Sequence, residues 1–261
     1  MLFLLSHASS GIDRFSFTAG AAEAGTGYTC ISKTGFWSSF QNQAILAYNK
    51  SIRAGVNYEN RFSLKETGIR SAGIIFPVNN TSIAGVFSHS GYSDFSRSFA
   101  GLACGLMLSE KISAGVQIDY FIERMAGEYR NNQYVSFETG VLITVTDNIS
   151  AGIQLFNPVP NSLRKTGIPS RLRAGAGIKM NQSLFTGIEA ELSTGKKLNI
   201  KTGFEYEFAG NLFLRGGFST ESSSFSFGLG YLLKSVMTDV SFSTHECLGI
   251  TSSVSLIFII H

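Results

Sequence analysis

Short runs in which apolar and polar residues alternate fill the chain from Ser51 to Ile260. In Lys111–Arg124, for example, Val116 and Ile118 lie on one side of the run, and Gln117 and Asp119 lie on the other. A period of two residues indicates a β-strand, because successive side chains point to opposite faces of a sheet. The pattern predicts fourteen strands, at 51–61, 66–76, 81–90, 96–108, 111–124, 132–145, 149–156, 171–179, 183–193, 198–208, 211–219, 223–233, 235–244 and 249–260.

The polar side of these runs is too charged for the core of a soluble protein. Leu198–Phe208, for example, places Lys201, Glu205 and Glu207 opposite an apolar side. Strands of roughly 9–11 residues cross a bilayer when they are apolar toward lipid and polar toward a lumen. No apolar run reaches the roughly 20 residues that a membrane helix needs. We therefore predict an all-β fold, an antiparallel transmembrane β-barrel of about 14 strands in the bacterial outer membrane, with 51–261 as one domain.

Connections between the predicted strands differ in length. Those after even-numbered strands are short: Val78–Asn80, Leu108–Glu110, Thr146–Asn148, Met180–Gln182 and Ala209–Asn211. Those after odd-numbered strands include His89–Phe95, Met125–Asn131 and Asn157–Ser170, although Ser193–Lys197 and Thr220–Ser222 are short. Outer-membrane barrels have short periplasmic turns and longer outer loops. We therefore expect both termini to be periplasmic.

A short motif recurs just inside five predicted strands. In each copy Ala-Gly follows an Ile or a Leu, and the glycines are Gly55, Gly85, Gly115, Gly152 and Gly175. Glycine in a strand permits close approach of another backbone or sharp curvature. We interpret this repeat as structural, because duplication of a hairpin would also produce it.

The first fifty residues do not alternate. Residues 1–10 contain the apolar stretch Leu2–Leu5 without a basic start, and we interpret them as the remnant of a signal peptide. Residues 11–50 are rich in Gly and Ala from Thr18 to Thr29 and carry an aromatic run at Phe36–Phe40. We predict that this second stretch forms an N-terminal plug, or hatch, inside the barrel.

The end of this stretch resembles the N-terminal motif of the FadL-like outer-membrane β-barrel superfamily, in particular its PorV/PorQ-type branch of Bacteroidetes. That motif reads Trp-Ser-x-Phe-x-Asn-Pro-Ala-Gly-Leu-Ala, and it is matched by Trp37, Ser38, Phe40, Asn42, Ala44, Leu46 and Ala47. Gln43 replaces its Pro and Ile45 replaces its Gly, so we expect an altered turn. The resemblance implies a plug that enters from the periplasmic end. It also implies a family in which some members carry hydrophobic compounds and others are partners of secretion systems.

Two groups of residues are candidate sites. The resemblance implies that Phe36, Trp37, Phe40, Asn42 and Leu46 form the plug or contact a ligand, and packing against the wall is the simpler reading of their rings. The polar strand faces predict a lumen charge ladder of Arg171, Arg173, Glu189, Glu191, Lys201 and Glu205. We expect Arg173 to lie beside Glu189, and Arg171 beside Glu191, across a hairpin centred near Asn181. Such mixed charge favours a packed lumen over a selective ion pore.

Catalytic and metal chemistry finds no support in the sequence. Its histidines are scattered over the N-terminal remnant, two predicted loops and the C-terminus: His7, His89, His245 and His261. There is no Gly-x-Ser-x-Gly nucleophile elbow and no metal-ligand spacing. The cysteines Cys30, Cys104 and Cys247 suggest no disulfide framework. With a net charge of +3 and no Lys/Arg cluster, we expect no enzyme activity, no cofactor and no nucleic-acid partner.

Three functions remain open from the sequence. The first is a FadL-like barrel that contacts outer-membrane lipids and passes a small hydrophobic molecule, releasing it through a kink or gap in the wall. The second is a non-transporting accessory barrel of a type IX-like secretion or surface-assembly system, which binds a secretion-system or surface protein through its loops. The third is a soluble lipocalin-like or sandwich protein.

Overall fold

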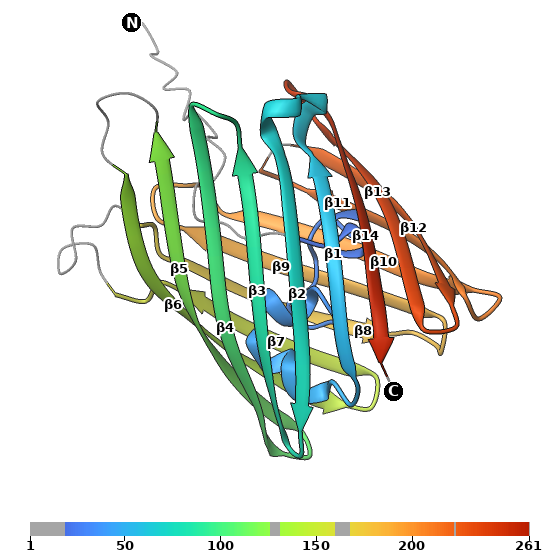
Figure 1. Cartoon of the computed structure of the whole chain (residues 1–261). Coiled ribbons are helices and arrows are strands. Elements are labelled where there is room, and N and C mark those ends of the chain that lie inside the picture. The colour runs from blue at the N-terminus through green and yellow to red at the C-terminus, as the bar shows by residue number, and fades with distance from the viewer. Residues whose placement is uncertain (1–18, 126–130, 160–167, 222, 261) are drawn as a thin grey trace, which may run out of the picture.

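Fourteen strands close into one antiparallel barrel in the computed structural model (Figure 1). The structure describes residues 19–125, 131–159, 168–221 and 223–260. The strands are β1 Ile52–Asn60, β2 Gly68–Val78, β3 Thr81–Gly91, β4 Phe95–Ser109, β5 Ile112–Met125, β6 Asn132–Thr146, β7 Ile149–Phe156, β8 Arg171–Lys179, β9 Leu184–Ser193, β10 Asn199–Phe208, β11 Leu212–Ser219, β12 Ser224–Leu233, β13 Val236–His245 and β14 Gly249–Ile260. Each strand pairs with its neighbours in sequence, and β1 closes the barrel on β14. The predicted fold is confirmed, and every strand end lies within two residues of its predicted position.

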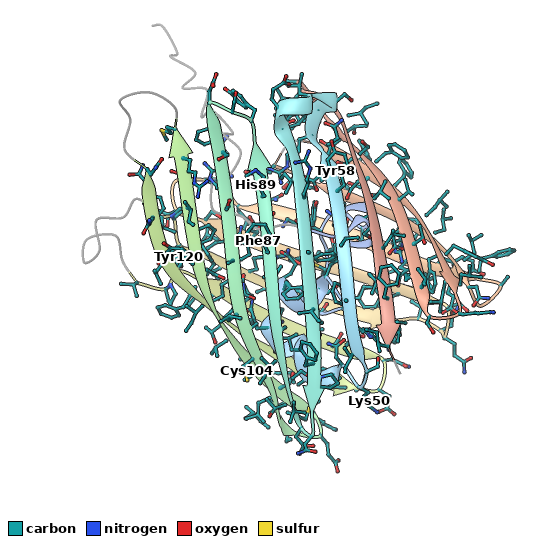
Figure 2. The ribbon with its side chains drawn as sticks, viewed as in Figure 1. Lys50, Tyr58, Phe87, His89, Cys104 and Tyr120 are labelled. Carbon is teal, nitrogen blue, oxygen red and sulfur yellow. The ribbon has the colours of Figure 1, made fainter. Side chains whose placement is uncertain are left out.

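The alternation in the sequence separates the inside of the wall from its outside. On β5 the side chains of Gln117 and Asp119 are buried in the lumen, whereas Ile118 on the opposite face is 64% exposed. Tyr58, Phe87 and Tyr120 stand on the same apolar outer face (Figure 2). Closure leaves no unpaired sheet edge, which is what a bilayer demands of a β-structure.

The two ends of the barrel differ. Tight turns close one end, at the lower edge of Figure 1, and include Asn79–Asn80 and Asp147–Asn148. Longer connections lie at the other end, where two 3-10 turns, η3 Arg61–Ser63 and η4 Lys65–Thr67, join β1 to β2. No helix in the described part of the chain is long and apolar enough to cross a membrane.

The predicted loop His89–Phe95 was too long. Strand β3 continues to Gly91 and β4 starts at Phe95, so His89 lies on a strand. Its Nδ1 atom is 3.0 Å from Ser98 Oγ on β4. The turn is tight because Gly91 adopts a φ of 114° and Tyr92 N donates to Phe95 O. His245 is likewise the last residue of β13 and not part of a loop.

The segment Ala19–Asn49, called the inner segment below, lies inside the barrel (Figure 1). It contains α1 Ala21–Gly25 and two 3-10 turns, η1 Ser38–Phe40 and η2 Gln43–Tyr48. Helix α1 packs against β11–β14, and η2 packs against β3–β6. The predicted signal-peptide remnant at 1–10 lies outside the described residues, as do residues 11–18 of the predicted plug.

Candidate functional site

Asn42 joins the inner segment to itself and to the wall. Its Oδ1 accepts a hydrogen bond from Ala44 N at the start of η2, while its Nδ2 donates to Ile31 O at 2.8 Å and to Val141 O on β6 at 3.3 Å. Gln43, which replaces the proline of the motif, donates from Nε2 to Glu138 Oε2 of β6 at 2.9 Å. A proline could not make this contact, so the departure from the motif adds a link to the wall.

Phe36, Trp37 and Phe40 form one aromatic cluster inside the barrel. The ring centroids of Phe36 and Trp37 are 4.9 Å apart, and those of Phe36 and Phe40 are 5.7 Å apart, both nearly edge-to-face. The cluster continues into buried apolar side chains that include Leu46, Ile75, Val86, Phe99, Phe121, Phe156 and Ile168. These apolar side chains extend from the inner segment along the wall, beside buried polar side chains such as Asp119 and Gln154.

A belt of glycines on the wall makes room for the inner segment. A Cβ at Gly105 would stand 2.6 Å from Gln43 O, and one at Gly175 would stand 2.7 Å from Ile31 Cγ2. Similar collisions with the inner segment would occur at Gly55, Gly115, Gly140, Gly152, Gly203 and Gly217. Glycines also face each other across strands, as Gly105, Gly115 and Gly140 do on β4, β5 and β6. Four of the five glycines of the repeat belong to this belt. The repeat therefore forms part of the surface against which the inner segment packs.

The predicted charge ladder lies on the inner face of β8, β9 and β10. Arg173 binds Glu189 at 2.6 Å, and Lys201 Nζ lies 2.5 Å from Glu191 Oε2. The Arg173 and Glu189 side chains are almost fully buried. Such close pairing is required of charges that are removed from water.

The register of the β8–β9 hairpin differs from the predicted one. Arg173 lies opposite Glu191 and Arg171 lies opposite Ser193, so the contact of Arg173 with Glu189 is diagonal. The cause is the turn, which spans 180–183 and moves the centre of the hairpin beyond Asn181.

The charged side of the wall also holds the inner segment. Lys33 Nζ lies 2.6 Å from Glu205 Oε2, and Glu205 is shared with Arg215 of β11. Arg173 Nη1 donates to Gln41 Oε1 at 2.8 Å. The backbone N–H groups of Cys30 and Ile31 each donate to Glu189 Oε2, at 3.2 Å. The structure thus brings the ladder and the inner segment together, which the sequence did not indicate.

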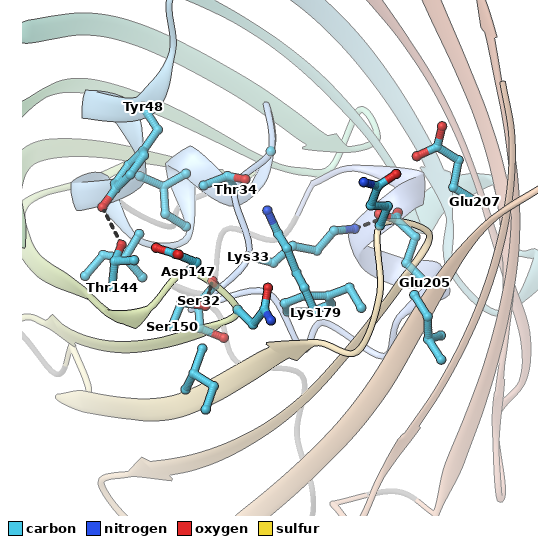
Figure 3. A pocket seen from close by; sticks show the side chains of 18 of the residues that line it. Ser32, Lys33, Thr34, Tyr48, Thr144, Asp147, Ser150, Lys179, Glu205 and Glu207 are labelled. Atoms are coloured by element: carbon cyan, nitrogen blue, oxygen red, sulfur yellow. Dashed lines mark hydrogen bonds and ion pairs between the residues drawn. The ribbon is translucent and has the colours of Figure 1, made fainter. Parts of the chain in front are cut away.

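A cavity of about 540 Å³, lined by both polar and apolar side chains, opens at the end of the barrel with the tight turns (Figure 3). The inner segment contributes Lys33 and Tyr48 to its lining, and the turns after β6 and β8 contribute Asp147 and Asn181. Tyr48 Oη lies 3.1 Å from Thr144 Oγ1 within this lining. The cavity therefore lies between the inner segment and the turns at this end of the barrel.

The surroundings of two titratable groups of the inner segment change their pKa values. Burial raises the pKa of Glu23, whose Oε1 accepts from Ser38 Oγ at 2.8 Å. Burial also raises the pKa of the Cys30 thiol to about 12. Cys30 is therefore a neutral, poorly nucleophilic group, and all three cysteines are free.

Sequence reasoning missed two features of the lumen. The glycine belt was visible as a repeat, but its partner could not be identified without the path of the inner segment. A buried polar cluster around Asp119 and Glu138 was also missed, although alternation had placed Asp119 on the inner face.

A closed antiparallel barrel with an apolar outside and a partly charged lumen defines the class of transmembrane β-barrels of the outer-membrane type. Solved structures of this class have the same fold. The Ralstonia pickettii toluene transporter TbuX has a TM-score of 0.73 at 11% identity, covering 93% of this chain and 98% of that chain. The CymD monoaromatic hydrocarbon channel has a TM-score of 0.74 at 12% identity, with coverage of 93% and 98%.

A Pseudomonas aeruginosa FadL homologue has a TM-score of 0.70 at 12% identity, and covers 94% of this chain and 99% of that chain. No protein-family model and no curated protein matches the sequence. At these identities the likeness establishes the fold, which is that of FadL-type barrels.

Proposed function

We propose that this protein is an outer-membrane barrel that passes small hydrophobic molecules across the outer membrane, with residues 11–50 acting as its plug. The observation that carries the proposal is the buried apolar cluster in the interior. It runs from Ile168 and Phe156, at the end with the longer connections, through Phe121 and Phe99 to the aromatic cluster of the inner segment. Such a cluster offers a small hydrophobic molecule contacts that the uniformly polar interior of a water-filled pore lacks.

The outer face and the comparisons support the same proposal. The wall is apolar toward its surroundings, with Leu102 72% and Phe227 65% exposed. Two of the structures with this fold are described as a toluene transporter and a monoaromatic hydrocarbon channel. We place the tight turns and both termini in the periplasm, following the usual arrangement of such barrels.

Binding can be measured through Trp37, which is the only tryptophan of the sequence. Titration of the purified barrel with toluene, or with a long-chain fatty acid in a separate arm, should change its fluorescence saturably. Phe121→Glu should weaken this response by more than about tenfold, because a carboxylate in the apolar interior costs several kcal/mol to desolvate. Phe121→Leu, the matched control, should retain it.

Uptake of the same compounds by cells that express the barrel separates transport from binding alone. Uptake above that of cells without the barrel, lost in Phe121→Glu, is expected. The sequence resemblance to PorV/PorQ-type proteins suggests the alternative, an accessory barrel for secretion or surface assembly. Absence of binding and uptake, with a large protein co-purifying through the loops, would favour that alternative and contradict the transport proposal.

A further inference from the structure

The outer face of the described strands carries cationic side chains in one place only. Those that point away from the lumen are Arg70 on β2, His89 on β3 and Arg124 on β5, and they are called the outer basic band below. The neighbours of the two arginines in the chain, Ser71 and Glu123, are buried on the lumen side. Alternation therefore directs both arginines outward, where they are exposed. All three residues lie at the end of the barrel with the longer connections.

The strand register brings the outer basic band together across four neighbouring strands. Arg70 lies directly across from His89, and His89 lies directly across from Ser98 on β4. Arg124 lies directly across from Ser96, also on β4. Strands of a sheet are about 4.8 Å apart, so three spacings separate Arg70 from Arg124 by about 14 Å. Two positive charges thus flank a polar surface of imidazole and hydroxyl groups.

No acidic side chain on the described strands balances this charge. Every Asp and Glu of these strands is on the lumen side, where most are buried. Neither Arg70 nor Arg124 forms an ion pair with a described residue. Glu66 and Asp94 are exposed in the adjoining connections, and neither is paired with the band. The outer basic band is therefore free to bind a negatively charged group.

The outer basic band lies where the apolar outer face ends. On β5 the outward positions from Ile112 to Ile122 are apolar or aromatic, and Arg124 is the next one. Ten residue steps of about 3.4 Å, tilted by about 40°, cover about 26 Å, which matches the apolar height of about 25 Å of such barrels. Phe87 and Tyr120 share the row just below the band (Figure 2). Aromatic girdles mark this level, so Arg124 lies among lipid headgroups.

The chemistry of the outer basic band selects phosphate as its ligand. Arginine binds phosphate through paired, charge-assisted hydrogen bonds. A phospholipid has one phosphate group, whereas Arg70 and Arg124 are about 14 Å apart and suit a headgroup with two. In the orientation proposed above, this end lies in the outer leaflet, whose glycolipid carries two phosphates on the disaccharide of its lipid A.

We propose that Arg70, His89 and Arg124 form a binding site for the phosphate groups of lipid A. The acyl chains of the lipid would pack on the apolar wall below, around Phe87 and Tyr120. The site relies on the proposed orientation of the barrel and is independent of transport. It would fix the outer leaflet against β2–β5, because the described strands elsewhere offer no outward cation.

The test uses the full chain purified in detergent. Native mass spectrometry of the barrel titrated with diphosphoryl lipid A should show saturable binding. Removal of both phosphates from the lipid should weaken binding by more than about tenfold, because the charge-assisted contacts are lost. Phosphatidylglycerol, which has a single phosphate, should also bind more weakly than diphosphoryl lipid A.

Single substitutions locate the site. Arg70→Gln and Arg124→Gln should each weaken the binding of diphosphoryl lipid A by more than about fivefold, since each removes one charge-assisted contact. Lys111→Gln is the matched control, because Lys111 is exposed and directly precedes β5 at the opposite end of the barrel. It should bind the lipid like the native protein.

Equal binding of diphosphoryl and dephosphorylated lipid A by the native protein would overturn the proposal, and this result requires no variant to fold. Phosphatidylglycerol that binds as tightly as lipid A would overturn the assignment to a lipid with two phosphates. The proposal also fails if both arginine variants, shown to be folded by circular dichroism, bind lipid A as tightly as the native chain. None of these measurements involves toluene binding or uptake, so this site and the transport proposal can fail separately.

Discussion

Gly115 on β5 lies directly against the backbone of Gln43 and Ala44. A Cβ at this glycine would overlap the Gln43 carbonyl group and stand 2.7 Å from Ala44 N. We expect Gly115→Ala to lower the free energy of unfolding by about 1–3 kcal/mol, as overpacking of a filled interior does. Urea unfolding of the barrel in lipid vesicles measures the change.

Gly85 provides the control within the same sequence repeat. It faces the outside, where a Cβ would come no closer than 3.9 Å to Ile74 and Leu102. Gly85→Ala should therefore change the free energy of unfolding by less than about 0.5 kcal/mol. Equal losses in the two variants would show that the glycine belt does not seat the inner segment.

The ion pair of Lys33 with Glu205 should contribute more to the free energy of unfolding than an exposed pair of the same type. Lys33→Met leaves Glu205 with Arg215 alone and should cost about 1–3 kcal/mol, the penalty for a buried polar group that loses a partner. Lys196, which lies 2.9 Å from Glu221 at the surface, is the control. Lys196→Met should cost less than about 1 kcal/mol, and chemical unfolding of both variants decides between these values.

Glu23 should make stability depend on pH. Its raised pKa means that the folded chain holds this proton more tightly than the unfolded chain does. Its contribution to stability is therefore complete below the ordinary pKa of 4.5 and is lost as the pH rises through the raised value. Glu23→Gln mimics the protonated acid. Its stability relative to that of the native protein should therefore increase as the pH increases.

Melting temperatures across a pH series measure this difference. Glu221→Gln, at an exposed position, is the control and should follow the native protein. A constant difference between Glu23→Gln and the native protein at all pH values would mean that folding does not raise the pKa of Glu23.

The cysteines test both burial and sidedness. Cys247 is exposed in the connection between β13 and β14, whereas Cys30 is buried with a pKa of about 12. A membrane-impermeant maleimide should therefore label Cys247 on intact cells, and Cys30 only after unfolding. Asn181→Cys in a Cys247→Ser background places a thiol in an opposite turn and should be labelled only in broken cells. Labelling of Asn181→Cys on intact cells would reverse the proposed orientation.

Much of the wall could be predicted from the sequence because a strand with one face in lipid must alternate. Ile118 and Asp119 are neighbours in sequence and opposite in environment, and that contrast alone fixes which way β5 faces. Tight turns were also predictable, since Asn79–Asn80 and Asp147–Asn148 carry typical turn residues. The connection after His89 was not, because a glycine with positive φ let the strands extend beyond their alternating part.

The interior was harder to predict because it depends on pairs that are distant in sequence. The diagonal contact of Arg173 with Glu189 reflects a shift of two residues in the pairing of β8 with β9. Alternation cannot detect such a shift, because it leaves every side chain on the same face. Lys33 reaches Glu205 only because the inner segment follows a particular path past β10. The aromatic run at Phe36–Phe40 indicated where packing occurs, but not that the wall opposite it would consist of glycine.

The closing of β1 on β14 also sets the order in which the molecule can be assembled. It brings Ile52 to Ile260, so the first strand finds its second partner only when the last strand has been made. Helix α1, which precedes β1, packs against β12, β13 and β14. Contacts this distant in sequence form slowly. Helix α1 can therefore reach its place only after β14 has been made, although it is among the first parts of the chain.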